Sequence, residues 1–470
     1  MTAGLAPVLW RWAVQDRPIR MTFPMTRKAH ARAILVLGLP LIGSHLAQIL
    51  LHVTDTVMLG WYGVTELAAV VIASSSFFVI FILGAGFAQA VMPMVASAIG
   101  RGDEVQVRRD TRMGLWLSIA FGLASYPLFW ASEPVLLALG QKPDVAALGQ
   151  EFLRIAGLGM IPALLVMVLK SYLAALERTQ VVLWVTLAGV GLNIALGWAL
   201  IFGNWGAPEL GVRGAAIASV AVQMLTALAL AGYAAWLPEL RHFHLFQRFW
   251  RPDWHALRQV FRLGMPIGFT SLAEGGMFQA SALMMGWIGT VQLAAHGIAL
   301  QATALTFMVH LGLSNATTVR TALAAGAGDV AGMREGGKVA IGLSMLFAVT
   351  TVVLFLAFPA AIVSLFLDTA KPESARIIAF GTALLAVAAL FQLTDALQVM
   401  ALGLLRGVKD TRVPMWIAAL SYWIIGIPAS YLLAFRAGYG GVGLWLGLVI
   451  GLSVAAALLM TRFWLRMPKA

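Results

Sequence analysis

The chain has 470 residues, of which 60% are hydrophobic and only 11% are charged, with a mean hydropathy of +0.87. A soluble domain carries roughly a quarter of its residues as charges, so most of this surface must face lipid and not water. The net charge of +12 does not indicate nucleic-acid binding, because the basic residues lie between apolar segments. The absence of cysteine excludes disulfides, thiolate metal sites and cysteine nucleophiles.

Residues 1–32 form the first predicted region, a basic tail in which Asp16 is the only acid. No apolar stretch is followed here by a small-residue cleavage site, so we expect a cytoplasmic tail and not a cleavable signal peptide. Met21 and Met25 are alternative start positions; a start at Met21 would leave out residues 1–20, and a start at Met25 would leave residues 1–24 out of the native protein.

Twelve apolar segments follow, each close to the ~20 residues that a helix needs to cross the bilayer. Helices are expected because the alternating ten-residue strands of a membrane barrel are absent. The predicted spans are 34–58, 67–96, 113–132, 152–175, 181–203, 213–237, 261–287, 292–317, 339–365, 377–403, 414–434 and 440–464.

The basic residues predict the orientation of these spans. With the N-terminus inside, 25 of the 32 Lys and Arg fall on the cytoplasmic side, six fall on the other side, and Lys170 lies within a span. The positive-inside rule therefore predicts cytoplasmic N- and C-termini. We expect a multi-pass protein of the bacterial inner membrane.

An internal repeat is the strongest organisational signal. A shift of 226 positions aligns residues 37–103 with 263–329 without a gap, and about 22 of the 67 pairs are identical. Shared apolar composition does not explain the matches of rarer residues, which include Pro40 with Pro266, Trp61 with Trp287 and Asp103 with Asp329. Six spans in each repeat place the pseudo-two-fold axis along the membrane normal, as in many secondary transporters.

We therefore predict an all-α membrane protein with twelve transmembrane helices in two pseudo-symmetric six-helix lobes. The predicted N-lobe is 33–237, a basic cytoplasmic linker covers 238–259, and the C-lobe is 260–470. The basic residues of the linker are expected to lie on the lipid headgroups.

Three acids inside the spans are the main functional candidates: Asp55, Glu274 and Asp395. A charge at mid-bilayer costs about 2.5–3.5 kcal/mol, so an acid there calls for an explanation. The repeat aligns Asp55 with Ser281 and Glu274 with Gln48, so symmetry does not require these acids. A buried carboxylate can exchange protons near neutral pH, and two or three can hold Na⁺. The alternative is that each acid caps a helix break or pairs with a polar neighbour.

Other polar and helix-breaking residues within the spans allow two interpretations each. Pro40 and Pro266 either kink their helices beside a cavity or bend them for packing. Asn193 either faces the cavity or hydrogen-bonds between helices. Lys170 and Arg406 are expected to extend to the cytoplasmic surface.

Three stretches resemble the NorM branch of the MATE (multidrug and toxic compound extrusion) exporters: residues 53–60, residues 206–211 and the run from Asp395 through Thr411. The resemblance implies that Asp55 is the N-lobe acid and that Glu274 with Asp395 is the C-lobe coupling pair, a possible Na⁺ site. Na⁺-coupled members often have Tyr where this chain has Phe391. A second polar residue expected after Asn193 is Gly197 here.

Polar and aromatic side chains near these acids are expected to line the substrate cavity. They are Gln48, Asn193, Gln279, Phe391 and Gln392.

The expected function is secondary active multidrug export, in which cationic amphipathic drugs or dyes are exchanged for Na⁺ or H⁺. We expect a monomer that contacts membrane lipids and small organic cations, with no cofactor, no catalytic residues and no nucleic acid. One alternative is a lipid-linked oligosaccharide flippase, although only Lys170 and Arg406 could contact its pyrophosphate. The other is an intramembrane enzyme such as a prenyltransferase, which needs paired acidic motifs that the spans lack.

Overall fold

The computed structural model describes residues 25–368 and 372–467, and within these ranges every regular element is a helix. The first half contains α2 (Arg27–Tyr62), α3 (Val64–Gly100), α4 (Glu104–Trp130), α5 (Glu133–Ala138), α6 (Pro143–Ala156), η1 (Gly157–Gly159), α7 (Met160–Ala175), α8 (Thr179–Phe202), η2 (Asn204–Gly206) and α9 (Gly211–Trp236). The second half contains α10 (Pro238–Arg241), α11 (Trp254–Ile288), α12 (Thr290–Ala327), α13 (Val330–Ala357), α14 (Pro359–Ser364), α15 (Ser374–Gly407), α16 (Arg412–Leu420), η3 (Ser421–Gly426), α17 (Ile427–Tyr431), η4 (Leu432–Arg436) and α18 (Gly440–Arg466).

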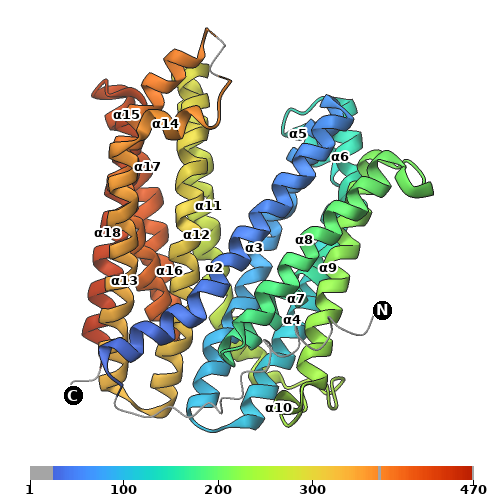
Figure 1. The fold of residues 1–470 in the computed structure, drawn as a ribbon, viewed down its shortest axis with the longest axis vertical. Helices are drawn as coiled ribbons and strands as arrows, with labels where there is room; N and C mark the ends of the chain where they lie inside the picture. The colour runs from blue at the N-terminus through green and yellow to red at the C-terminus, as the bar shows by residue number, and fades with distance from the viewer. Residues whose placement is uncertain (1–24, 369–371, 468–470) are drawn as a thin grey trace, which may run out of the picture.

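These helices form two bundles, which confirms the predicted all-α fold with two lobes (Figure 1). Helices α2–α9 make up the N-lobe, and α11–α18 make up the C-lobe. The bundles meet at the end that carries the α3–α4 and α12–α13 turns, which we call the basal end. They diverge toward the opposite end, where the short helices α5, α6 and α14 lie (Figure 1).

Each of the twelve predicted spans corresponds to a helix or to a stacked group of helices. Eleven of them, within the described residues, are long and apolar enough to cross a membrane. The exception is α11, whose 35 residues include Arg258, Arg262 and Glu274. The helices also extend beyond the predicted spans at the basal end; α2, for example, begins at Arg27 and not near residue 34. Residues 1–24 of the predicted tail lie outside the described residues.

The repeat places the same capping residues at the same points of both lobes. Asp103 caps α4 by accepting a 3.0 Å hydrogen bond from the Gln106 backbone N–H, and Asp329 caps α13 through Gly332 in the same way at 2.8 Å. An N-cap carboxylate accepts a hydrogen bond from a backbone N–H group that has no partner within the helix. Because Asp103 and Asp329 are repeat equivalents, α4 and α13 begin at equivalent positions in the two lobes. The conservation of these positions between the two halves therefore has a structural cause.

Glycines allow the lobes to pack closely at the basal end. Gly100 of α3 and Gly326 of α12 are repeat equivalents, and a Cβ on either would lie 3.1 Å from the Cα of the other. Farther along the same interface, a Cβ on Gly86 of α3 would lie 2.7 Å from the Cα of Gly268 on α11. Backbones this close admit no larger residue, so the basal interface is a tight helix-on-helix contact.

Two helices pack against both lobes at this interface. In the N-lobe α2 packs on α8, and it also contacts α12 and α13 of the C-lobe. In the C-lobe α11 packs on α12 and α16, and it also contacts α3 and α4 of the N-lobe. The two first helices of the repeats therefore couple the lobes. Pro40 and Pro266 lie inside these two helices, and the predicted kinks stay predictions.

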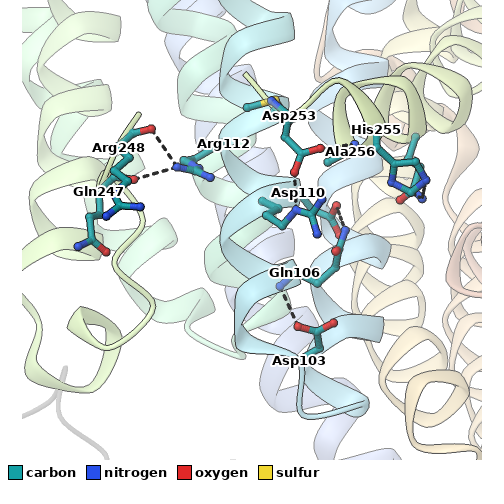
Figure 2. A network of polar contacts seen from close by, with 12 residues as sticks. Asp103, Gln106, Asp110, Arg112, Gln247, Arg248, Asp253, His255 and Ala256 are labelled. Atoms are coloured by element: carbon teal, nitrogen blue, oxygen red, sulfur yellow. Dashed lines mark hydrogen bonds and ion pairs between the residues drawn. The ribbon is translucent and has the colours of Figure 1, made fainter. Parts of the chain in front are cut away.

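The basic linker is anchored to the N-lobe as well as exposed. Phe243 and Leu245 are buried, whereas the intervening and following basic residues are exposed. Arg112 of α4 donates hydrogen bonds to the carbonyls of Gln247 (2.8 Å) and Arg248 (3.1 Å), as Figure 2 shows. Alternating buried and exposed residues keep the linker against the basal end while its charges stay outside.

Candidate functional site

Glu274 and Asp395 form the acidic centre of the C-lobe. Glu274 lies midway along α11 and Asp395 midway along α15, and their charges are close enough to interact. Asp395 is only 1% exposed. Both oxygens of Asp395 and Oε1 of Glu274 are buried without a hydrogen-bond partner. The structure thus brings together two of the three acids singled out from the sequence.

The surroundings of this pair include residues that the sequence analysis did not single out. Gln398, one turn after Asp395 on α15, donates a 2.6 Å hydrogen bond from Nε2 to Tyr422 Oη. Tyr422 lies in the π-helical segment η3 and interacts electrostatically with both acids. Gln398 could have been found from its spacing of three residues, but Tyr422 comes from a helix that only the fold places here. π-helical turns of this kind often occur at functional sites.

Two predicted cavity residues, Phe391 and Gln392, are buried within the C-lobe. The ring of Phe391 packs edge-on against Phe278 and Trp445, with centroids 5.9 and 5.6 Å away. Gln392 donates a 2.6 Å hydrogen bond from Nε2 to Thr306 Oγ1, and its own carbonyl oxygen has no partner. Both residues support the helix that carries Asp395, and contact with a substrate stays a prediction. Gln279, a third predicted residue, is exposed on α11.

Asp55 is the centre of a separate polar cluster in the N-lobe. Asn193 of α8 donates a 2.5 Å hydrogen bond from Nδ2 to Asp55 Oδ1, and Ser219 of α9 donates a 3.4 Å bond to Oδ2. Asn193 is fully buried, and its carbonyl oxygen has no partner. The pairing of Asp55 with a polar neighbour matches one of the two sequence interpretations. The contribution of Ser219 had no signal in the sequence.

Lys170 and Arg406 do not extend to the cytoplasmic surface as expected. Lys170 Nζ lies 3.5 Å from Ser44 Oγ on α2, and Arg406 Nη1 lies 3.3 Å from Gln89 Oε1 on α3. The Arg406 contact crosses from one lobe to the other. The expectation was wrong because both side chains take polar partners on other helices inside the protein. Gln48, another predicted cavity residue, lies half-buried on α2 beside His45.

Chemically, the C-lobe centre can bind a positive charge. Its unpartnered atoms are hydrogen-bond acceptors: three carboxylate oxygens, with the carbonyl oxygens of Gln392 and Gln398 on the same helix as Asp395. A buried acceptor without a partner is unfavourable, so a proton or a hard cation would stabilise this arrangement. Among the described residues no group of three His, Cys, Asp or Glu could hold a metal ion. A cation here would therefore rely on two carboxylates and neutral oxygens.

Comparison with known proteins places the chain in a family. The MatE family model matches residues 40–199 and 266–432, one segment in each lobe. The chain is 49% identical over 435 residues to "Probable multidrug resistance protein NorM" of Rhizobium meliloti (strain 1021), covering 93% of each protein. It is 46% identical over 435 residues to the protein of the same name in Agrobacterium fabrum, covering 93% of the chain and 94% of that protein.

Solved structures share the fold. "Crystal structure of MATE in complex with MaL6" matches with a TM-score of 0.85 and 22% identity, covering 93% of this chain and 96% of that chain. "Crystal structure of eukaryotic MATE transporter AtDTX14" matches with a TM-score of 0.82, 21% identity and the same coverage. These likenesses are of fold alone.

Proposed function

Because the chain belongs to the MatE family, we propose that it is a secondary active multidrug exporter that exchanges organic cations for Na⁺ or H⁺. It is a multi-pass membrane transporter and not an enzyme. Relatives that bear the name multidrug resistance protein support multidrug efflux, because they match the chain over nearly their whole length. The coupling ion and the substrate class are the parts of this proposal that need their own argument.

The single observation that carries the coupling proposal is the unpartnered acid pair of Glu274 and Asp395. Arg406 interacts with the charge of Glu274, but two buried carboxylates beside one guanidinium cannot both stay ionised without further compensation, since burying each charge costs several kcal/mol. A proton or Na⁺ provides that compensation from solution. An organic cation can provide it as well, so the ion and the substrate compete for the same negative charge.

Competition of this kind produces exchange of ion for substrate if the charge of the pair also depends on how the two lobes are arranged. Glu274 lies on α11, which packs against α3 and α4 of the N-lobe and α16 of the C-lobe. Its charge also interacts with Arg406, which contacts Gln89 of the N-lobe. We infer that neutralising Glu274 weakens its attraction to Arg406 and so alters the lobe contact. Asp55, held by Asn193 and Ser219, is the proposed N-lobe counterpart.

The remaining parts of the proposal concern placement. We propose the bacterial inner membrane, with both termini and the basal end in the cytoplasm, because the basal loops are rich in Lys and Arg. The proposed division is a tail at 1–32, an N-lobe at 33–237, a linker at 238–259 and a C-lobe at 260–470. We further propose that the protein works as a monomer among membrane lipids.

The test is transport by the purified protein in proteoliposomes, with Na⁺ and pH gradients imposed independently. If the protein uses Na⁺ or H⁺, the inward movement of that ion down its gradient should drive ethidium in the opposite direction. Glu274→Gln and Asp395→Asn should each lower this coupled transport at least tenfold. Asp144→Asn is the matched control, because Asp144 is an exposed acid in the first turn of α6. Transport that ignores both gradients, or acid variants that behave like the wild type, would contradict the proposal.

A further inference from the structure

Arginine and tryptophan side chains lie exposed together where the basic linker meets α11. They are Arg248, Trp250, Arg251, Trp254 and Arg258, which we call the linker patch. Trp250 and Trp254 are 73% and 72% exposed. Trp254 and Arg258 are one turn apart at the start of α11, so they lie on the same face of that helix. Exposed tryptophan beside basic residues is typical of the boundary between a membrane and water.

The positive charge of the linker patch has no acidic partner among the described residues. The segment 238–262 contains two acids, Glu239 and Asp253. Glu239 pairs with Arg178 and Asp253 pairs with Arg109, so both acids are already compensated. The three arginines of the linker patch form no ion pair within the described part of the chain. An anion that neutralises them must come from outside this part of the chain.

The linker is fastened to α4 of the N-lobe at three points. Arg109 pairs with Asp253, the N-cap of α11. Arg112 donates to two linker carbonyls (Figure 2), and Trp116 donates a 2.9 Å hydrogen bond from Nε1 to the carbonyl of Phe249. These α4 residues are three and four positions apart, so they lie on one helix face. Helix α11 packs on both lobes, so the linker patch adjoins a helix that joins them.

We propose that the linker patch binds the headgroups of anionic phospholipids and thereby holds the start of α11 against α4. Guanidinium groups bind phosphate oxygens through paired hydrogen bonds, and tryptophan rings prefer the headgroup level of a bilayer. A zwitterionic lipid carries its own positive charge beside the phosphate, so the patch should prefer lipids with a net negative charge. A soluble polyanion would neutralise the arginines but would leave both tryptophan rings in water. This inference goes beyond transport and does not depend on the coupling ion.

The first test measures which lipids the purified full-length protein retains in detergent. Phosphatidylglycerol and phosphatidylcholine with identical acyl chains are added at equal concentrations, and the bound lipids are counted by native mass spectrometry. Wild type should retain about fivefold more phosphatidylglycerol, because each arginine near an anionic headgroup adds an attraction of that order. The combined changes Arg248→Gln, Arg251→Gln and Arg258→Gln should reduce this ratio to less than about twofold.

A matched control removes three positive charges from basic residues outside the linker patch. Lys28, Arg32 and Arg412 are exposed and form no salt bridge among the described residues. The combined changes Lys28→Gln, Arg32→Gln and Arg412→Gln should keep the preference for phosphatidylglycerol. If the triple linker variant aggregates, Arg251→Gln alone replaces it and should lower the ratio by a smaller amount.

Two results of this test would overturn the inference. Equal retention of both lipids by wild type would leave a soluble acidic partner as the occupant of the linker patch. An equal ratio in the two triple variants would show that the preference does not depend on the linker patch.

The second test measures whether the bound lipid holds the lobes together. Ser97→Cys, at a position buried in the basal interface, is the only cysteine of the variant chain and reports opening. The protein is placed in nanodiscs of phosphatidylcholine alone or of equal parts of the two lipids. Maleimide labelling should be about fivefold slower with phosphatidylglycerol, and the triple linker variant should lose this difference. Equal labelling rates in both nanodiscs would refute the effect of the lipid on the lobes.

Discussion

Arg320 Nη1 donates a 2.9 Å hydrogen bond to Glu177 Oε1, and this ion pair joins the two lobes at the basal end. Arg320 lies on α12, and Glu177 lies in the turn between α7 and α8 with a left-handed φ of 60°. The equivalent turn of the C-lobe, between α15 and α16, places Lys409 at φ 59°, where its charge interacts with Asp110 of α4. Each lobe thus presents a charged turn residue to the other lobe: the acidic Glu177 from the N-lobe and the basic Lys409 from the C-lobe.

Loss of the Arg320–Glu177 pair should open the basal end. Glu177→Gln removes the partner of a guanidinium whose side chain is only 11% exposed, which costs about 1–3 kcal/mol. Because the chain has no cysteine, Ser97→Cys, buried at the basal interface, reports opening without further changes. Labelling of this cysteine by an impermeant maleimide in inside-out vesicles should accelerate at least fivefold.

The control for this experiment is Lys338→Gln. Lys338 pairs with Glu335 on the same helix and is 54% exposed, so its removal should leave the labelling rate unchanged. Equal rates in Glu177→Gln and wild type would show that the pair does not hold the basal end closed.

Gly326→Ala should destabilise the protein by forcing the basal backbones apart. The added methyl group meets the Ser97 carbonyl and the backbone of Gly100, and overpacking of this kind costs about 1–3 kcal/mol. Gly342→Ala is the matched change in α13, where nothing lies within 4 Å of the new Cβ. Thermal unfolding in detergent should give a lower Tm for Gly326→Ala and an equal or higher Tm for Gly342→Ala. The reverse order would contradict the close packing of α3 and α12.

Asn193→Ala should destabilise the N-lobe more than Ser219→Ala. Both donate to Asp55, but Asn193 does so at 2.5 Å and Ser219 at 3.4 Å. Loss of the shorter bond leaves an oxygen of the half-buried Asp55 carboxylate without its donor, at a cost of about 1–3 kcal/mol. The measurement is again Tm in detergent, with the Asp55→Asn background as the control. In that background the two variants should differ less, and an unchanged difference would show that Asp55 is not involved.

The ion pair of Arg109 and Asp253 should make stability depend on pH at the acidic end. Asp253 caps α11 at Ala256, and the hydrogen bond from Arg109 lowers the pKa of its carboxyl below the ordinary 3.8 (Figure 2). Since the folded pKa is depressed, the stabilisation is complete above the unfolded value and disappears as the pH falls through the folded pKa. An ion pair near the surface contributes at most about 1 kcal/mol.

Asp253→Asn isolates this contribution because asparagine also caps helices well. The variant should have a slightly lower Tm than wild type at pH 7, and the difference should shrink below pH 4. If the difference in Tm between the variant and wild type is constant from pH 7 to pH 3, it arises from packing and not from the charge of Asp253.

The sequence by itself determined the helices, the two lobes and the acids at their centres. Spans are readable because each must bury its backbone in lipid over a fixed thickness, and the 226-residue repeat maps one lobe onto the other. Asp55, Glu274 and Asp395 could be found because a charge in such a span is costly and therefore rare.

Only the tertiary structure decided which side chains meet. Helices that are apolar on every side give no signal of which face turns inward, so the rotation of α15 toward α11 and η3 could not be predicted. The electrostatic interaction of Asp395 with Glu274 and the hydrogen bond of Gln398 with Tyr422 depend on that rotation. The inward positions of Lys170 and Arg406 depend likewise on Ser44 and Gln89, which belong to other helices. The sequence shows where a charge lies within an apolar span, where burial is unfavourable. The partner of that charge is determined by how separate helices pack, which the sequence does not show.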